Sequence, residues 1–85
     1  MTKSDITLGY IKASSYRSKI IKALEGKKLT PIEMAKETDI PISHVSNTLA
    51  ELLDKDLVVC LTPKLKKGRL YELTANGKKI LKNLM

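Results

Sequence analysis

The sequence predicts a mainly α-helical chain with one small antiparallel β-hairpin, an α+β fold. Two observations carry this prediction. Residues 30–56 have the pattern of two short amphipathic helices joined by a tight turn. Residues 57–62 and 69–74 are strand-like segments on either side of a turn-rich stretch, which is typical of a hairpin. With 85 residues, the chain is long enough for one small domain with a modest core.

The first helix of the pair has several start signals. Thr30 is a good N-cap, and Pro31 follows at the first helical position, where its missing N–H costs nothing. Glu33 completes a T-x-x-E capping box, and Leu29 and Met34 are spaced to form a hydrophobic staple. We therefore expect this helix to begin at residue 31. Its apolar side is expected to consist of Ile32, Met34 and Ala35.

The turn covers residues 38–41. Asp39 tolerates a left-handed conformation, and Pro41 prevents the first helix from continuing. The second helix is then expected over about residues 42–55. Its apolar residues recur at helical spacing and predict one buried stripe. They are Ile42, Val45, Leu49 and Leu52, with Leu53 beside them.

Polar side chains lie opposite this stripe in the N-terminal half of the second helix. None carries a full charge at neutral pH, and all donate or accept hydrogen bonds, as base edges and phosphates require. They are Ser43, His44, Ser46 and Asn47, with Thr48 at the margin of the stripe. Two helices of this kind form a helix-turn-helix, in which one helix braces and the other enters a groove. We interpret residues 42–55 as a recognition helix in the major groove of double-stranded DNA.

Within this helix, we expect Ser43, His44 and Asn47 to read bases. Asn47 is of the type that pairs bidentately with adenine. Ser46 and Thr48 are expected nearer the phosphates.

The segments that precede residues 30–56 are expected to pack against the two predicted helices. Residues 1–12 are interpreted as an N-terminal arm or short helix, with a strand as the alternative, and residues 13–85 as the domain itself. Residues 13–25 predict a helix with Ser14 or Ser15 as its cap and Gly26 as its stop. This helix is expected to pack across the back of the helix-turn-helix.

Residues 63–69 form the predicted hairpin tip, which is strongly basic. Its cations are Lys64, Lys66, Lys67 and Arg69. Surface lysines can simply keep hairpin edges from aggregating. Beside a recognition helix, they are better explained as contacts to the phosphate backbone. Arg69 is expected to lie nearest a minor groove, since narrow minor grooves attract arginine.

Net charge supports a polyanionic partner, and its distribution is uneven. The chain has a formal charge of +7 and a pI of about 9.6. From residue 29 to residue 57 acidic residues outnumber basic ones. From residue 63 to residue 82 the balance reverses, and Glu72 is the only acidic residue. A binding mode that uses the second helix alone would be electrostatically poor, whereas one that adds the basic hairpin tip (residues 63–69, the wing) would not.

The last predicted element is a helix over residues 75–85 with Thr74 as its cap. Its apolar residues are Ile80, Leu81 and Leu84. Together with Leu8, Tyr10 and Ile11, they are expected to leave an exposed apolar side, because a chain of this size can bury only a modest core. This predicts a homodimer held by the terminal segments. The alternative is that these residues close the core of a monomer.

The predicted order of helix, helix, helix, strand, wing, strand and helix is that of a winged helix-turn-helix. The chain resembles the MarR-like and ArsR-like transcriptional regulators in LTPIEMAKETDIPISHVSNTLAELLDKDLV, and the small archaeal members of that superfamily in ASSYRSKIIKAL and VVCLTPKLKKGRLYELTANGKKIL. The chain departs from the usual pattern where Asp39 and Asp56 replace glycines and Pro41 replaces a serine or threonine cap. The resemblance implies a homodimer that binds a palindromic operator.

Other chemistry is not indicated. His44 has no partner at metal-ligand spacing, and Cys60 is interpreted as a small core residue. The sequence contains no catalytic set of residues and no phosphate-binding glycine loop. We therefore expect neither an enzyme nor a cofactor. No cysteine pair of the ArsR-like metal-sensing kind and no small-molecule site are evident. One cysteine fits a reducing cytoplasm, and no segment has the length of a membrane span. The alternative function is a winged-helix module that binds protein or RNA in a larger assembly.

Overall fold

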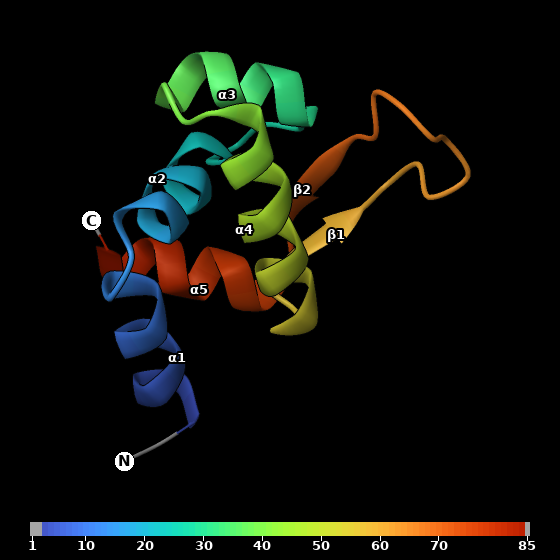
Figure 1. The fold of residues 1–85 in the computed structure, drawn as a ribbon. Helices are drawn as coiled ribbons and strands as arrows, with labels where there is room; N and C mark the ends of the chain where they lie inside the picture. The colour runs from blue at the N-terminus through green and yellow to red at the C-terminus, as the bar shows by residue number, and fades with distance from the viewer. Residues whose placement is uncertain (1–2, 85) are drawn as a thin grey trace.

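A computed structural model of the chain describes the backbone of residues 3–84 and the side chains of residues 8–84 (Figure 1). Met85, predicted as the end of the last helix, lies outside the described residues, as do Met1 and Thr2 of the predicted arm. The order is the predicted one, and the N-terminal segment is a helix rather than a strand. The elements are α1 (Lys3–Lys12), α2 (Ser15–Ala23), α3 (Pro31–Thr38), α4 (Ile42–Asp54), β1 (Val58–Cys60), β2 (Tyr71–Leu73) and α5 (Ala75–Leu84).

The helix ends follow the predicted local signals. The Ser14 hydroxyl caps α2 by accepting a hydrogen bond from the Arg17 N–H at 3.4 Å. Thr30 and Glu33 form both hydrogen bonds of the capping box, at 3.3 Å and 2.9 Å. Asp39 ends α3 with a φ of 59°, in the left-handed region. Because these signals act within a few residues, the sequence is sufficient to place them.

The hairpin is antiparallel, with Val58 opposite Leu73 and Cys60 opposite Tyr71. Each strand has three residues, so the ladder is shorter than predicted. On its other side, β2 pairs with Leu29, whose N–H and carbonyl bond to the Tyr71 carbonyl and N–H at 3.0 Å and 2.9 Å. This bridge was not predicted, and it ties the start of α3 to the base of the wing.

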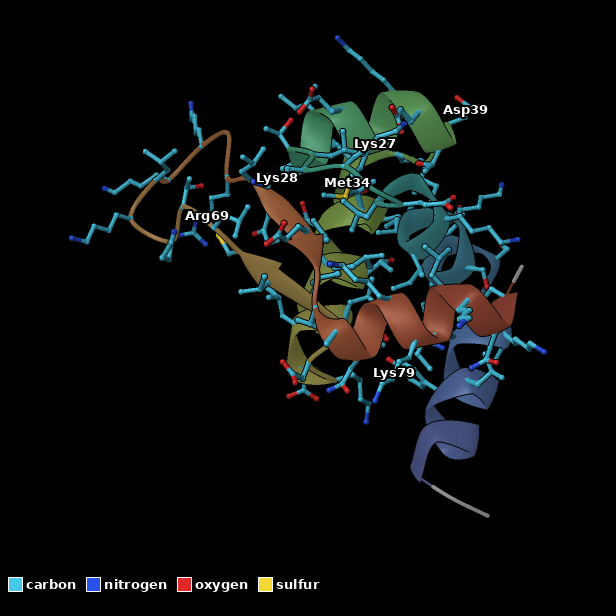
Figure 2. All side chains as sticks on the ribbon, turned by 180° about the vertical axis from the view of Figure 1, so that it is seen from behind. Lys27, Lys28, Met34, Asp39, Arg69 and Lys79 are labelled. Carbon is cyan, nitrogen blue, oxygen red and sulfur yellow. The ribbon has the colours of Figure 1, made fainter. Side chains whose placement is uncertain are left out.

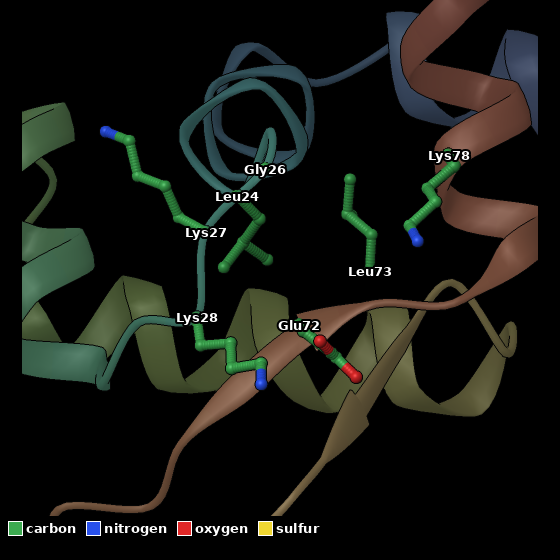
Figure 3. Close-up of a pocket in the computed structure, with 7 residues that line it drawn as sticks. All are labelled: Leu24, Gly26, Lys27, Lys28, Glu72, Leu73 and Lys78. Carbon is green, nitrogen blue, oxygen red and sulfur yellow. The ribbon is translucent and has the colours of Figure 1, made fainter.

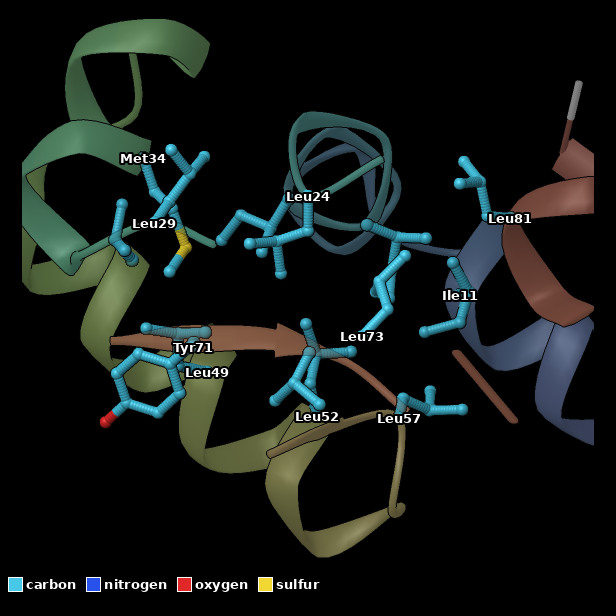
Figure 4. Packing of buried hydrophobic residues seen from close by; sticks show 14 of the residues in the cluster. Ile11, Leu24, Leu29, Met34, Leu49, Leu52, Leu57, Tyr71, Leu73 and Leu81 are labelled. Carbon is cyan, nitrogen blue, oxygen red and sulfur yellow. The ribbon is translucent and has the colours of Figure 1, made fainter. Parts of the chain in front are cut away.

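The core lies between the helices and one face of the hairpin (Figure 4). Its buried residues come from all five helices, both strands and the connecting segments. They are Ile11, Ile20, Ile21, Leu24, Leu29, Met34, Ile40, Val45, Leu49, Leu52, Leu57, Val58, Tyr71, Leu73, Ile80 and Leu81. Cys60 is partly buried and packs against this cluster, as expected for a small core residue.

Three apolar residues predicted to face the core do not. Ile32 is 59% exposed, Ile42 is 47% exposed and Leu53 is 39% exposed. Ile32 and Ile42 lie in the first turns of α3 and α4, at the solvent side of each helix. The buried side of α4 is centred on Val45 and Leu52 instead. Helical spacing alone identifies an apolar stripe but not which of its margins the neighbouring elements cover.

The apolar residues predicted to form an exposed dimer surface are largely internal. Ile11 is fully buried, and Ile80 and Leu81 are 4% and 6% exposed. Leu8, Tyr10 and Leu84 are partly buried against the same cluster. The prediction of an exposed apolar side was therefore wrong for Ile11, Ile80 and Leu81, because α1 and α5 pack together and close the core of the single chain.

The start of α5 is packed tightly against the segment that leads into β1. The Thr74 hydroxyl accepts from the Gly77 N–H at 3.0 Å and donates to the Asp56 carbonyl at 2.6 Å. A β-carbon on Gly77 would lie 2.0 Å from the Leu57 carbonyl oxygen, so only glycine fits there. Asp56 has a φ of 59°, as expected from its place in the pattern. This junction joins the last helix to the base of the wing.

Candidate nucleic-acid interface

The N-terminal half of α4 presents a polar surface to solvent. Ser43, His44, Ser46 and Asn47 are all exposed, while Val45 and Leu49 between them are buried. At about 100° per residue, Ser43 and Asn47 lie opposite the buried side of the helix. In Figure 1, α4 runs across the body of the molecule, and the hairpin projects beyond it. The N-terminal half of α4 thus carries an uncharged polar surface that the rest of the described chain leaves open to solvent.

Thr48 does not belong to this surface. Its side chain is 4% exposed, and it lies three residues after Val45 and four before Leu52, on the buried side of α4. The interpretation of Thr48 as a residue near the phosphates is therefore corrected. Its hydroxyl made it appear polar in the sequence, but its helical position groups it with the apolar stripe.

His44 lies at the edge of the polar surface, next to α2. The centroid of its ring is 5.3 Å from that of Tyr16, with the planes at 48°. This contact joins α2 to α4 across 28 positions of sequence, and no local signal in the sequence indicates it.

A second contact between the same helices lies further along α4. Arg17 Nη2 is 2.8 Å from Glu51 Oε2, and the Tyr10 hydroxyl donates to the same oxygen at 2.9 Å. The hydrogen bonds from Arg17 and Tyr10 hold the pKa of the Glu51 carboxyl below its usual range. Burial, followed by the hydrogen bond to Glu51, raises the pKa of the Tyr10 phenol. Sequence reasoning missed this contact and assigned Tyr10 to a dimer surface instead, because residues so far apart in the chain carry no shared pattern.

The wing is an irregular loop between the two short strands, and its cations are exposed. Lys64, Lys66, Lys67 and Arg69 all face solvent. Arg69 Nε donates to the Leu65 carbonyl, which lays the guanidinium across the loop (Figure 2). The Thr62 hydroxyl accepts from the Leu70 N–H at 2.9 Å and steadies the base of the loop. The tip therefore carries four positive charges with few contacts to the body.

A shallow cavity lies away from α4, between the end of α2, β2 and α5 (Figure 3). It has an apolar floor and a charged rim. Its lining residues are Leu24, Gly26, Lys27, Lys28, Glu72, Leu73 and Lys78. The Lys27 ammonium is 3.0 Å from a Glu37 carboxylate oxygen. None of the predicted contact residues lines this cavity.

Two further findings concern the described residues only. Within residues 8–84, no three His, Cys, Asp or Glu side chains come together as metal ligands would. No helix in that range combines the length and apolar character needed to cross a membrane.

Comparison with known proteins gives structural but no sequence-level relatives. No protein-family model matches the chain, and no curated protein matches it. The reduced form of MarR from E. coli is 24% identical with a TM-score of 0.76, over 91% of this chain and 58% of that chain. NadR in complex with 4-hydroxyphenylacetate is 27% identical with a TM-score of 0.75, over 99% of this chain and 61% of that chain.

A MarR mutant from E. coli complexed with operator DNA is 24% identical with a TM-score of 0.74, over 96% of this chain and 63% of that chain. The chain has the MarR winged-helix fold. The predicted fold class is thereby confirmed. The matched proteins are transcription regulators rather than enzymes, in agreement with the expectation for this chain. The chain spans less than two thirds of the length of each of the three.

Proposed function

We propose that the chain is a transcription regulator that binds double-stranded DNA sequence-specifically, with α4 in the major groove. The observation that carries the proposal is the exposed, uncharged polar face of α4. Ser43, His44 and Asn47 are proposed to contact bases, and Ser46 a phosphate. An exposed face rich in apolar side chains would instead have favoured a protein partner.

The wing is proposed to supply the phosphate contacts. Its cations are Lys64, Lys66, Lys67 and Arg69, all exposed at the end of a projecting loop. Because residues 29–57 carry an excess of acidic groups, α4 needs a source of positive charge beside it to approach DNA. The Nε of Arg69 is used inside the loop, so its terminal amino groups are the ones proposed to reach the minor groove.

The experiment is a selection of bound sites from random double-stranded DNA, followed by affinity measurements at several salt concentrations. The proposal expects one enriched sequence, with much tighter binding to it than to random DNA and a steep salt dependence of both. If no sequence is enriched and binding to DNA is absent at low salt, the proposal is wrong. A winged-helix module for protein or RNA would then be the better explanation.

A homodimer is proposed as the DNA-binding form, since a palindromic operator requires two copies of α4. The residues proposed to contact the second copy are Leu8, Tyr10 and Leu84, which are partly buried and lie near the two ends of the chain. Sedimentation at micromolar concentration, alone and with the selected DNA, tests this. A species that remains a monomer in both conditions would contradict the proposed homodimer.

We also propose that the protein is cytoplasmic and that it is related to the small archaeal and ArsR-like regulators.

A further inference from the structure

One edge of α4 faces α1 and α2 and carries polar side chains. This edge consists of His44 and Glu51, and the C-cap residue Lys55 follows them at helical spacing on the same side. Each is contacted from α1 or α2. The Tyr16 ring lies against His44, Arg17 and Tyr10 bond to Glu51, and the Lys55 ammonium is 5.3 Å from the centre of the Tyr10 ring. The recognition helix is thus held at points about two turns apart along this polar edge.

Arg17 makes the most demanding of these contacts. Its Nη2 bonds to Glu51 at 2.8 Å, and its Nη1 donates to the Tyr10 carbonyl at 3.0 Å. The guanidinium carbon also lies 3.8 Å from the centre of the Tyr10 ring. A guanidinium is planar, so meeting these three conditions together fixes the mutual orientation of α1, α2 and α4.

The apolar stripe of α4 does not provide this directional control. Contacts of Val45, Leu49 and Leu52 with the core depend on buried area and tolerate small rotations. Base reading requires donors and acceptors held within roughly 0.5 Å and 10–20° of the productive geometry. Glu51 lies one turn after Asn47 on the same side of α4, so a rotation that separates Glu51 from Arg17 also moves Asn47.

The Arg17 side chain is partly buried, with 20% of its surface exposed. Its Nε is buried, and within the described residues it has no hydrogen-bond partner. The side chain is therefore held through its two Nη groups, which bond to the Tyr10 carbonyl and to Glu51.

We propose that Arg17 and Tyr10, acting through Glu51, are positioning residues that set the rotation of α4 about its own axis and thereby the sequence specificity of DNA binding. This inference rests on the proposed function. Arg17, Tyr10 and Glu51 do not contact DNA in this scheme.

The test compares two carboxylates that each pair with one cation. Glu51→Gln weakens the contact with Arg17, and Glu37→Gln weakens the ion pair with Lys27, which does not involve α4. Both variants remove one negative charge, so their general effect on DNA affinity is matched. Arg17→Met removes the guanidinium and keeps an unbranched side chain. Arg17→Lys restores the charge but not the planar fork.

We expect Arg17→Met to lower the ratio of affinities for selected and random DNA by about tenfold, the loss that a 1.4 kcal/mol change produces. Affinity for random DNA should change only by the sequence-independent effect of one lost positive charge, which Arg17→Lys restores. Arg17→Lys should recover little of the ratio, Glu51→Gln should lower it less, and Glu37→Gln should leave it unchanged. An unchanged ratio in Arg17→Met, full recovery in Arg17→Lys, or a parallel loss on both DNAs would overturn the proposal.

A second measurement needs no DNA. Residual dipolar couplings of backbone amides report the orientation of α4 relative to α2 in the free protein. We expect a changed orientation in Arg17→Met and in the milder Glu51→Gln, with the couplings of Glu37→Gln matching the parent chain. If the parent chain fails to discriminate between DNA sequences, the proposed function fails, while the couplings still decide whether these residues position α4. An unchanged orientation in both Arg17→Met and Glu51→Gln overturns the positioning role.

Discussion

Helix α4 and the wing are held in opposite ways. α4 has 13 residues, packs on α2, α3 and β1, and is anchored along its polar edge by Tyr10, Tyr16 and Arg17. The wing joins strands of three residues each, and its cations lie in solvent. A group that reads bases needs a fixed geometry, whereas a cation that contacts phosphate only needs to come close. The difference in packing therefore matches the two tasks proposed for these regions.

Helix α4 and the wing also differ in the charge of the segments that contain them. The segment 29–57, which contains α4, has more acidic than basic residues, and the wing has four cations within residues 64–69. Specificity is therefore expected to depend on α4, and salt-dependent affinity on the wing. A change at the junction of α5 with the base of the wing should disturb both regions, and changes confined to α4 or to the wing should separate them.

The largest effect is expected from Gly77→Ala. The added methyl group would lie 2.0 Å from the Leu57 carbonyl oxygen, which is backbone and cannot turn aside. Forcing α5 away from this point should cost about 1–3 kcal/mol or slightly more, because it strains a packed junction. Thermal unfolding measures the loss. Gly9→Ala is the matched control, since no atom lies within 4 Å of the added group and α1 should tolerate or favour alanine.

An unchanged melting temperature in Gly77→Ala would show that the junction yields easily. The base of the wing would then be free to move relative to α4. The difference in packing between α4 and the wing would then not be maintained by this junction.

Local signals in the sequence were sufficient for most of the elements. The capping box of Thr30 and Glu33, the left-handed Asp39 and the cap at Thr74 each depend on groups within four residues. The basic tip of the hairpin was also found where a run of lysines predicted it.

What the sequence could not show depends on distant partners. The bridge between Leu29 and Tyr71 and the ion pair between Arg17 and Glu51 join segments with no common pattern. The exposure of Ile42 depends on which margin of α4 is covered by its neighbours. The dimer argument failed for Ile80 because composition cannot tell how much apolar surface a small fold buries.

The next effect concerns base reading by α4. Asn47→Ala should lower affinity for selected DNA by about 1–3 kcal/mol, the worth of one bidentate contact to a base, and should leave affinity for random DNA nearly unchanged. Titration of both DNAs at one salt concentration measures this. Ser15→Ala, at an exposed position on α2, serves as the control. Equal losses on selected and random DNA would reject Asn47 as a base-reading residue.

The wing should show the complementary behaviour. Lys66→Ala with Lys67→Ala should weaken binding to selected and random DNA alike and reduce the slope of log affinity against log salt by roughly 0.9 for each phosphate that is no longer neutralised. The melting temperature should barely change, since exposed charges contribute little to folding. The control is Lys19→Ala with Lys22→Ala, which removes two exposed cations from α2. An unaltered slope in the wing variant would make the wing a solubility device and favour the protein-binding alternative.

The smallest effect is a pH dependence of the contact that anchors α4. Glu51 has a lowered pKa because Arg17, and then Tyr10, bonds to its charged form. Its contribution to stability is therefore fully present above the ordinary carboxyl pKa of 4.5 and is lost as the pH falls through the lower folded value. The difference in melting temperature between the parent chain and Glu51→Gln should be constant near neutral pH and shrink below about pH 4.5.

Glu33 titrates in the same range, because its carboxylate accepts the Thr30 N–H and its pKa is lowered by that bond. It is present in both the parent chain and Glu51→Gln, so its effect cancels from their difference. Glu33→Gln keeps an oxygen that can accept the Thr30 N–H, so measuring it in parallel gives the contribution of the Glu33 charge. If the difference between the parent chain and Glu51→Gln does not change down to pH 3, the charge on Glu51 does not stabilise the fold. The anchoring of α4 would then rest on Tyr16 and the apolar stripe, and the helix would be less distinct from the wing than its contacts indicate.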